Sequence, residues 1–145
     1  MTEPRTNPYS VSVAGIVVDD SGRALLVRRR ENGLWEPPGG ILEQDETVYD
    51  GLRREVREET GLEVEPGPLT GVYQNMRMHV IALAFRCTAT GGQLSPSPET
   101  SDFVWAEPDE IPSLTTEVFA VRLQDGLAAQ VPPPVRWHDG VRILS

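Results

Sequence analysis

The stretch that decides the fold is residues 40–62, GILEQDETVYDGLRREVREETGL. Its second half predicts an α-helix over residues 47–60, because an apolar residue recurs every four positions and so returns to one helix face. These apolar residues are Val48, Leu52 and Val56. Most other positions of the segment are polar or charged, so we expect one buried face and one exposed face.

Both ends of this helix carry the residues expected of caps. Thr47 or Asp45 can accept hydrogen bonds from backbone N–H groups of the first turn. Gly61 stands where helices commonly end in a left-handed residue. Gly51, inside the helix, costs about 1 kcal/mol relative to alanine, so we expect another group to pack closely against it.

Three glutamates share the exposed face of the predicted helix. At 100° per residue, Glu55, Glu58 and Glu59 fall within an arc of roughly 100°. Like charges at this spacing destabilise a helix, whereas carboxylate oxygens are the ligands that Mg²⁺ prefers. Arg54 precedes Glu58 by one turn and can pair with it. A solvated charged face is the alternative interpretation, because REVREE is an ordinary surface string.

A wider spacing pattern favours the metal-binding interpretation. Gly40, Glu46 and the run Arg-Glu-aliphatic-x-Glu-Glu-x-Gly-aliphatic at 54–62 fix nine positions. At all nine, the segment resembles the signature box of the Nudix (MutT-like) hydrolases. The preceding Trp35-x-x-Pro38-Gly39 also resembles the approach to that box, with Pro37 where many members carry another residue.

The resemblance implies a fold, a reaction and a cofactor. The expected fold is the Nudix-type α/β/α sandwich with a mixed β-sheet, as a single domain over residues 1–145. The expected activity is Mg²⁺- or Mn²⁺-dependent hydrolysis of a nucleoside diphosphate linked to another moiety. Divalent ions would neutralise the diphosphate oxygens and lower the pKa of a bound water.

The resemblance also assigns metal-binding and catalytic residues. Glu55, Glu58 and Glu59 resemble the metal-binding glutamates of the family, with Glu55 or a neighbour assisting deprotonation of the attacking water. Gly39 resembles the residue whose backbone carbonyl also touches the metal, which suits a glycine at a close approach.

Three further residues are assigned to support the glutamates. Arg54 resembles the arginine that orients a box glutamate, and Glu46 resembles the acid that braces the loop against the helix. Some members recruit a further acid from a later loop, and Glu99, six residues before Trp105, is the candidate; a loop glutamate in water is the alternative.

The rest of the chain predicts strands, a loop and a second helix. Segments rich in valine and isoleucine, or bounded by turn residues, predict strands at 9–18, 23–29, 70–73, 78–88 and 103–105. Residues 34–40, with two prolines and two glycines, predict a loop of fixed shape, and 66–68 (Pro-Gly-Pro) a connection. Residues 114–129 carry a helical pattern. The order strands, helix, strands, helix favours a mixed sheet covered on both faces.

The composition argues against several classes of protein. Thirteen arginines and no lysine against twenty-two acidic residues give a net charge of −9, which argues against non-specific nucleic-acid binding. A bound divalent cation still allows a small phosphorylated ligand. No apolar stretch approaches the roughly 20 residues of a membrane span, and residues 1–5 show no secretory signal. The single cysteine, Cys87, excludes an internal disulfide. We therefore expect a cytoplasmic protein.

Substrate contacts are predicted at three positions. Arg28 follows the second strand and can reach a phosphate, although alternation sends neighbouring arginines to opposite faces. Trp35 can stack on a base or simply pack, and Arg77 can line the cleft or lie on the surface. Members that cleave ADP-ribose usually carry proline where Arg77 stands, and members that cleave dinucleoside polyphosphates tend to have tyrosine near Met78.

Because these markers are missing, we expect the substrate to be a nucleoside triphosphate, oxidised ones included, rather than a nucleotide sugar or an ADP-ribose-like diphosphate. The expected products are a monophosphate and pyrophosphate. A non-catalytic nucleotide-sensing module is the alternative from another class, and the intact glutamates count against it. The expected partner is a small nucleotide derivative rather than nucleic acid or membrane, and the family resemblance is compatible with a homodimer.

Overall fold

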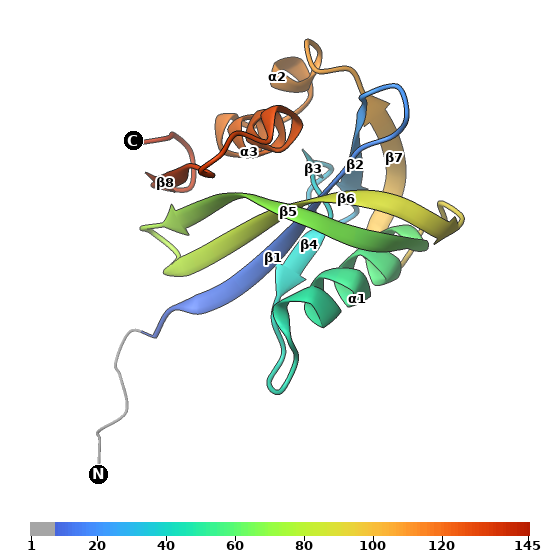
Figure 1. Ribbon diagram of the computed structural model, residues 1–145, viewed down its shortest axis with the longest axis horizontal. Helices are drawn as coiled ribbons and strands as arrows, with labels where there is room; N and C mark the ends of the chain where they lie inside the picture. The colour runs from blue at the N-terminus through green and yellow to red at the C-terminus, as the bar shows by residue number, and fades with distance from the viewer. Residues whose placement is uncertain (1–7) are drawn as a thin grey trace.

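A five-stranded mixed sheet forms the centre of the molecule (Figure 1). The structure, a computed structural model, describes residues 8–145, so the amino-terminal residues 1–5 discussed above lie outside it. The strand order is β4-β1-β6-β5-β8. The β1–β6 and β5–β8 pairs are parallel, and the others are antiparallel. The bounds are β1 (Ser10–Val17), β4 (Gly39–Ile41), β5 (Leu62–Asn75), β6 (Val80–Gly92) and β8 (Val135–His138).

A smaller antiparallel sheet of three strands lies beside it, in the order β3-β2-β7. Its strands are β3 (Trp35–Glu36), β2 (Ala24–Arg29) and β7 (Thr100–Ala106). The first half of β2 is fully buried, so both of its faces belong to the core.

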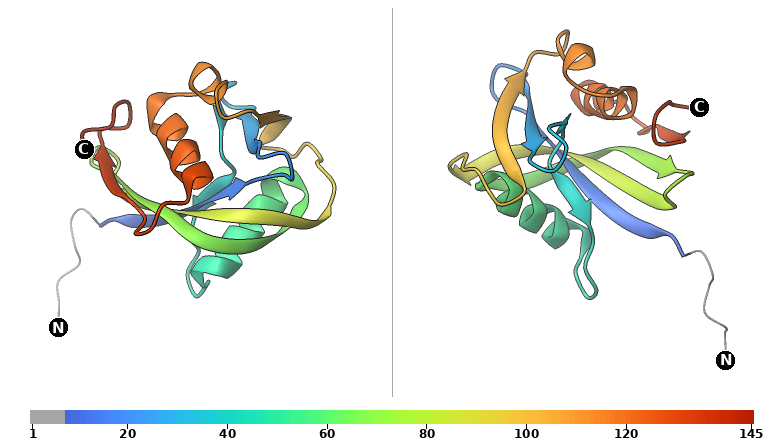
Figure 2. Two further views of the ribbon diagram at one scale, coloured as in Figure 1. Left: turned by 45° about the horizontal axis from the view of Figure 1, so that its top comes forward. Right: turned by 180° about the vertical axis from the view of Figure 1, so that it is seen from behind.

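Helices cover the two faces of the five-stranded sheet. Figure 2 shows α1 (Val48–Thr60) on one face and α3 (Glu117–Ala128) on the other, and the short α2 (Ile111–Leu114) precedes α3. Leu52 and Val56 of α1 are fully buried in one apolar cluster, and Leu123 of α3 is fully buried in another. The predicted α/β/α sandwich with a mixed sheet is confirmed.

The caps of α1 follow the sequence prediction. Thr47, rather than Asp45, is the N-cap, and its side chain accepts a hydrogen bond from the backbone N–H of Asp50 at 3.1 Å. Gly61 ends the helix with φ 83°. A methyl group added at Gly51 would lie 2.3 Å from Cδ2 of Leu42, so the expected close packing against this glycine is confirmed.

Three sequence predictions differ from the structure. Residues 34–40 include the short strand β3 and the start of β4, both at sheet edges, and the two prolines lie between these strands. Strand β5 continues through 66–68, with register shifts there that absorb the two prolines. The predicted helix 114–129 begins only at Glu117, after the separate helix α2.

The carboxyl-terminal tail, which the sequence pattern left unplaced, adds strand β8 to the sheet. It pairs in parallel with the end of β5, so that His138 lies beside Asn75. No helix within residues 8–145 is long and apolar enough to cross a lipid bilayer.

Candidate active site

Strand β4 brings two glycines against the centre of β1 and the acidic face of α1. Gly39 pairs with Ala14, and Gly40 with Val13. A methyl group at Gly39 would lie 2.2 Å from the carbonyl oxygen of Val13, and one at Gly40 would lie 2.6 Å from the carboxylate of Glu55. Only glycine allows this close approach of the backbone to the glutamates.

The carboxylate of Glu59 is buried beside this backbone, with 3% of the residue exposed. The N–H of Gly39 donates to it, 3.2 Å from Oε2 and 3.4 Å from Oε1. Burial raises the pKa of Glu59 to about 8; the Gly39 N–H opposes the rise, and the nearby charges of Glu55 and Glu36 add to it. The negative charge at Glu59 is thus only partly compensated by the residues around it.

Arg54 connects the loop after β4 to the glutamates of α1. Its guanidinium donates to both carboxylate oxygens of Glu46, to Oε1 of Glu55 at 2.9 Å and to Oε2 of Glu58 at 3.2 Å. These bonds raise the pKa of Arg54 and lower that of Glu46 to about 2. The expected pairing of Arg54 with Glu58 is present, and Glu46 braces the loop against the helix.

Glu99 lies close to the same carboxylates. It lines a cavity of about 270 Å³ together with Glu58, Ser97 and Pro98, in the loop before β7. Burial raises the pKa of Glu55; Arg54 opposes this, and the charges of Glu58 and Glu99 add to it. The loop therefore delivers a fourth acidic side chain to the region that the sequence predicted.

The donor chemistry of this region fits a hard divalent cation. Glu59 is a buried carboxylate with no cationic partner in hydrogen-bonding contact among residues 8–145, and Glu55, Glu58 and Glu99 supply further oxygens nearby. Within residues 8–145, however, no three acidic, histidine or cysteine side chains converge into a ready-made ion site. Glu55 and Glu58 are paired with Arg54 instead. We call the region of Glu55, Glu58, Glu59 and Glu99 the acidic cleft.

Arg29, rather than Arg28, is the arginine of β2 that lies beside the two glycines of β4. Arg29 bonds Glu36 at 3.0 Å and lines a cavity of about 210 Å³ that reaches Gly39 and Gly40. Arg28 is exposed, and its Nε donates to the carbonyl of Gly33 at 3.1 Å. The alternation of side chains along the strand decides between them.

Trp35 and Arg77 lie outside the acidic cleft. Trp35 is half-buried against the apolar core, and its carbonyl accepts a hydrogen bond from the hydroxyl of Thr115 at 2.6 Å, so packing is the role that its contacts describe. Arg77 is exposed in the turn between β5 and β6. It lines neither the cavity that reaches Gly39 and Gly40 nor a second, larger cavity of about 250 Å³ that adjoins it.

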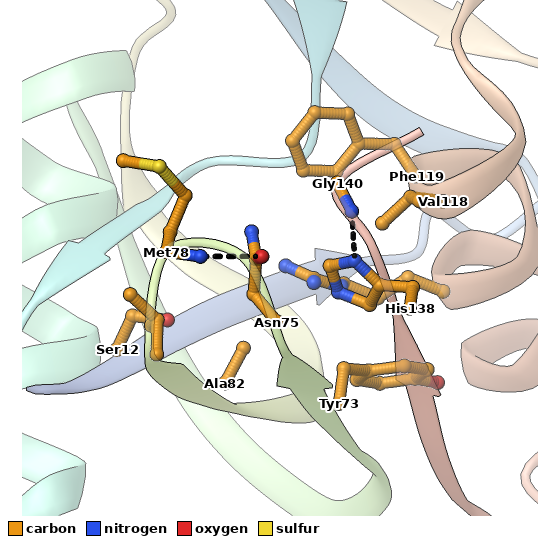
Figure 3. Close-up of a pocket in the computed structure, with 11 residues that line it drawn as sticks. Ser12, Tyr73, Asn75, Met78, Ala82, Val118, Phe119, His138 and Gly140 are labelled. Atoms are coloured by element: carbon orange, nitrogen blue, oxygen red, sulfur yellow. Dashed lines mark hydrogen bonds between the residues drawn. The ribbon is translucent and has the colours of Figure 1, made fainter. Parts of the chain in front are cut away.

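Sequence reasoning missed the polar groups of that larger cavity. Arg122, on α3, lines both it and the cleft near Gly39. Asn75 and His138, at the ends of β5 and β8, line it as well (Figure 3). One signal was available for Arg122: it follows Val118 by four residues, so an arginine shares the buried face of a helix.

Comparison with known proteins identifies a family model that matches most of the chain. The model of the NUDIX domain matches residues 8–123. The chain belongs to the Nudix family. A MutT-like protein of Streptomyces ambofaciens is 48% identical over 99% of this Nudix chain and 96% of its own length. A putative 8-oxo-dGTP diphosphatase of Bacillus subtilis is 32% identical over 72% of this chain and 70% of its own length.

Solved structures show the same fold. The crystal structure of an ADP-ribose pyrophosphatase from Streptococcus suis matches with a TM-score of 0.74 and 26% identity, covering 89% of this chain and 98% of that one. This Nudix chain is thus a member of a hydrolase family whose enzymes act on phosphoanhydride bonds and generally use divalent metal ions.

Proposed function

We propose that this Nudix hydrolase cleaves a nucleoside triphosphate, with Mg²⁺ or Mn²⁺, to a nucleoside monophosphate and pyrophosphate. The observation that carries the proposal is the buried carboxylate of Glu59, which accepts the N–H of Gly39 and lies close enough to Glu55 for the charge of Glu55 to raise its pKa. A protein of net charge −9 needs cations between itself and a polyphosphate, and these carboxylates supply the oxygens to hold them.

The metal ligands that we propose are Glu55, Glu58, Glu59, Glu99 and the carbonyl of Gly39. A divalent ion bound among them would neutralise the phosphate oxygens and lower the pKa of a water molecule. Glu55 would accept the proton of the attacking water, and Arg54, bonded to it at 2.9 Å, would keep that carboxylate in position. Arg54 is in turn fixed by Glu46.

A positive side chain near Gly39 supports the binding of phosphate. Arg29 lines the cavity that reaches Gly39 and Gly40, and its pairing with Glu36 fixes the guanidinium. Arginine is well suited to phosphate oxygens because its N–H groups form a planar fork. We therefore assign the phosphate-contacting role predicted for Arg28 to Arg29.

A triphosphate substrate is supported by the likeness to a putative 8-oxo-dGTP diphosphatase and by the missing ADP-ribose marker at Arg77. Hydrolysis of an ADP-ribose-like diphosphate is the second candidate, because an ADP-ribose pyrophosphatase shares the fold over 89% of the chain. The cytoplasmic location, the lack of a nucleic-acid partner and the homodimer stay predictions.

Product analysis tests the proposal. The protein would be incubated with Mg²⁺ and separately with GTP, ATP, UTP, CTP, 8-oxo-dGTP, ADP-ribose and a UDP-sugar, and the products separated by ion-exchange chromatography. We expect a monophosphate and pyrophosphate from at least one triphosphate, and none when EDTA is present. Cleavage of ADP-ribose alone would favour the second candidate, and binding without turnover across the panel would favour a sensing module.

A further inference from the structure

The cavity beside α3 is walled largely by apolar groups and adjoins the site of the proposed reaction. It has a volume of about 250 Å³ and shares Ser12, Phe119 and Arg122 with the cavity that reaches Gly39 and Gly40. Whole small-molecule pockets usually run to about 300–1,000 Å³, so this one is suited to a single moiety of a nucleotide. Apolar walls come from β6 and α3, through Val80, Ala82, Val118 and Phe119.

Arg122 brings a buried guanidinium without an anionic partner to this cavity. The residue is 8% exposed, and its side chain makes no hydrogen bond or ion pair with any residue from 8 to 145; Nε is fully buried and unsatisfied. Its Cζ lies 4.8 Å from the ring centre of Tyr73 and 5.3 Å from that of Phe119. These contacts use the faces of the rings and leave the N–H groups without acceptors.

His138 adds a second unpartnered donor. Its Nδ1 accepts the backbone N–H of Gly140 at 3.0 Å, as the dashed line in Figure 3 shows. In a neutral imidazole the proton must then be on Nε2, which is a donor. The residue is 2% exposed, and its Nε2 has no hydrogen-bond partner within the described chain. Burial lowers the pKa of His138, and the charge of Arg122 lowers it further, which favours this neutral form.

Asn75 presents its amide nitrogen rather than its oxygen. Its Oδ1 accepts the backbone N–H groups of Arg77 at 3.0 Å and Met78 at 2.9 Å, which fixes the orientation of the side chain. Figure 3 shows the bond from Met78 as a dashed line. Its Nδ2, which can only donate, remains for the cavity. Tyr73 is committed elsewhere, because its hydroxyl donates to Asp125 at 2.7 Å. Arg122, His138 and Asn75 therefore all present donors, and the hydroxyl of Ser12, which also lines the cavity, can donate or accept.

We propose that this cavity, with Arg122, His138 and Asn75 as specificity-determining residues, binds a nucleobase with a keto oxygen at C6 of a purine or C4 of a pyrimidine. It discriminates against a base with an amino group at that position. Guanine offers O6 and N7 as acceptors and uracil or thymine offers O4, whereas adenine and cytosine place an amino donor at the corresponding position. An amino group of the base placed against these three side chains would leave their buried N–H groups without an acceptor. An unpaired buried N–H costs more binding free energy than a hydrogen bond that is simply not formed. The inference rests on the proposed function, whose site it extends.

Binding of the four nucleoside monophosphates tests the cavity without requiring hydrolysis. We expect calorimetry to show GMP and UMP binding at least about 10-fold more tightly than AMP and CMP, the size of one hydrogen bond to a charged group. Arg122→Met should reduce this preference to less than about 3-fold, and the exposed Arg142→Met serves as the matched control. If the monophosphates bind with this preference but no triphosphate is cleaved, the proposed function fails and the inference stands.

The substitution Asn75→Asp replaces the donor Nδ2 with an acceptor oxygen. It should not disturb the turn between β5 and β6, because the other aspartate oxygen can still accept from the backbone N–H groups of Arg77 and Met78. We expect this variant to gain affinity for AMP and CMP relative to GMP and UMP, by about 3-fold or more. Equal binding of keto and amino bases by the wild-type protein would overturn the inference. A uniform loss for all four bases in Arg122→Met would also overturn it, because it would place the guanidinium on phosphate or in a structural role.

Discussion

Arg54 donates two hydrogen bonds to the carboxylate of Glu46, from Nε to Oε2 and from Nη2 to Oε1, the second at 2.9 Å. This pairing occupies one side of the guanidinium and leaves Nη1 for Glu55 and Glu58. Two helix carboxylates that would repel each other are thus held by a cation that the preceding loop keeps in place. The acidic face of α1 tolerates its charge because Arg54 has this second anchor.

The pairing predicts a pH-dependent contribution to stability. The pKa of Glu46 is about 2 in the folded protein, against an ordinary value of 4.5, so the folded state binds fewer protons. Its contribution is complete above about pH 4.5 and is lost as the pH falls toward about 2. We expect Glu46→Gln to lower the free energy of unfolding more at about pH 7 than at about pH 3.5, measured by urea denaturation with EDTA present. An equal penalty at both pH values would contradict this, and the exposed Glu63→Gln is the control.

The glutamates of α1 should dominate turnover. We expect Glu55→Gln and Glu59→Gln each to lower kcat by at least about 100-fold, because each change removes a proposed metal ligand or the proposed base. Steady-state kinetics with Mg²⁺ and a cleaved triphosphate would measure this, with circular dichroism to check folding. Glu63→Gln changes an exposed residue of β5 whose side chain pairs with Arg57, and it should leave kcat within about 2-fold. Near-normal turnover in both variants would mean that the wrong carboxylates are assigned.

Gly39 should not accept a side chain. A methyl group there would lie 2.2 Å from the carbonyl oxygen of Val13 and 2.8 Å from Cα of Ala14, and backbone cannot move aside as a side chain can. We expect Gly39→Ala to cost about 1–3 kcal/mol of unfolding free energy, the usual range for overpacking. It should also lower kcat, because β4 positions the backbone against Glu55.

Gly91→Ala is the matched control for this change, because the nearest atom to an added methyl group there is Cβ of Glu63 at 3.9 Å. Its effect should stay within about 0.5 kcal/mol, as for most surface substitutions. If both variants unfold at the same denaturant concentration, the close approach of β4 to β1 is wrong.

Cys87 should be chemically inert in the folded protein. The residue is 1% exposed, and burial raises the pKa of its thiol to about 12, so almost no reactive thiolate exists at neutral pH. We expect Ellman's reagent to label less than about 5% of the native protein over an hour at pH 8 and to label it fully in guanidinium chloride. Rapid labelling of the native protein would show that this part of the core opens readily.

Much of the helix α1 and of its chemistry could be read from residues 40–62. The spacing of Leu52 and Val56 defines the buried face, and Thr47 and Gly61 define the ends, because helical hydrogen bonds and caps involve residues only a few positions apart. The acidic face follows from the same geometry. Strands were less well bounded: β5 runs through Pro66, because a bulge in the pairing with β6 tolerates what an isolated strand would not.

The arrangement of the candidate site came only from the tertiary structure. Strand pairing selected Arg29 over Arg28, and it placed Gly39 against Glu59, twenty positions away. The parallel pairing of β5 with β8 set His138 beside Asn75, and the packing of α3 on the sheet brought Arg122 to them. Periodicity within a segment reports which face is buried, but it carries no information about which distant segment covers that face.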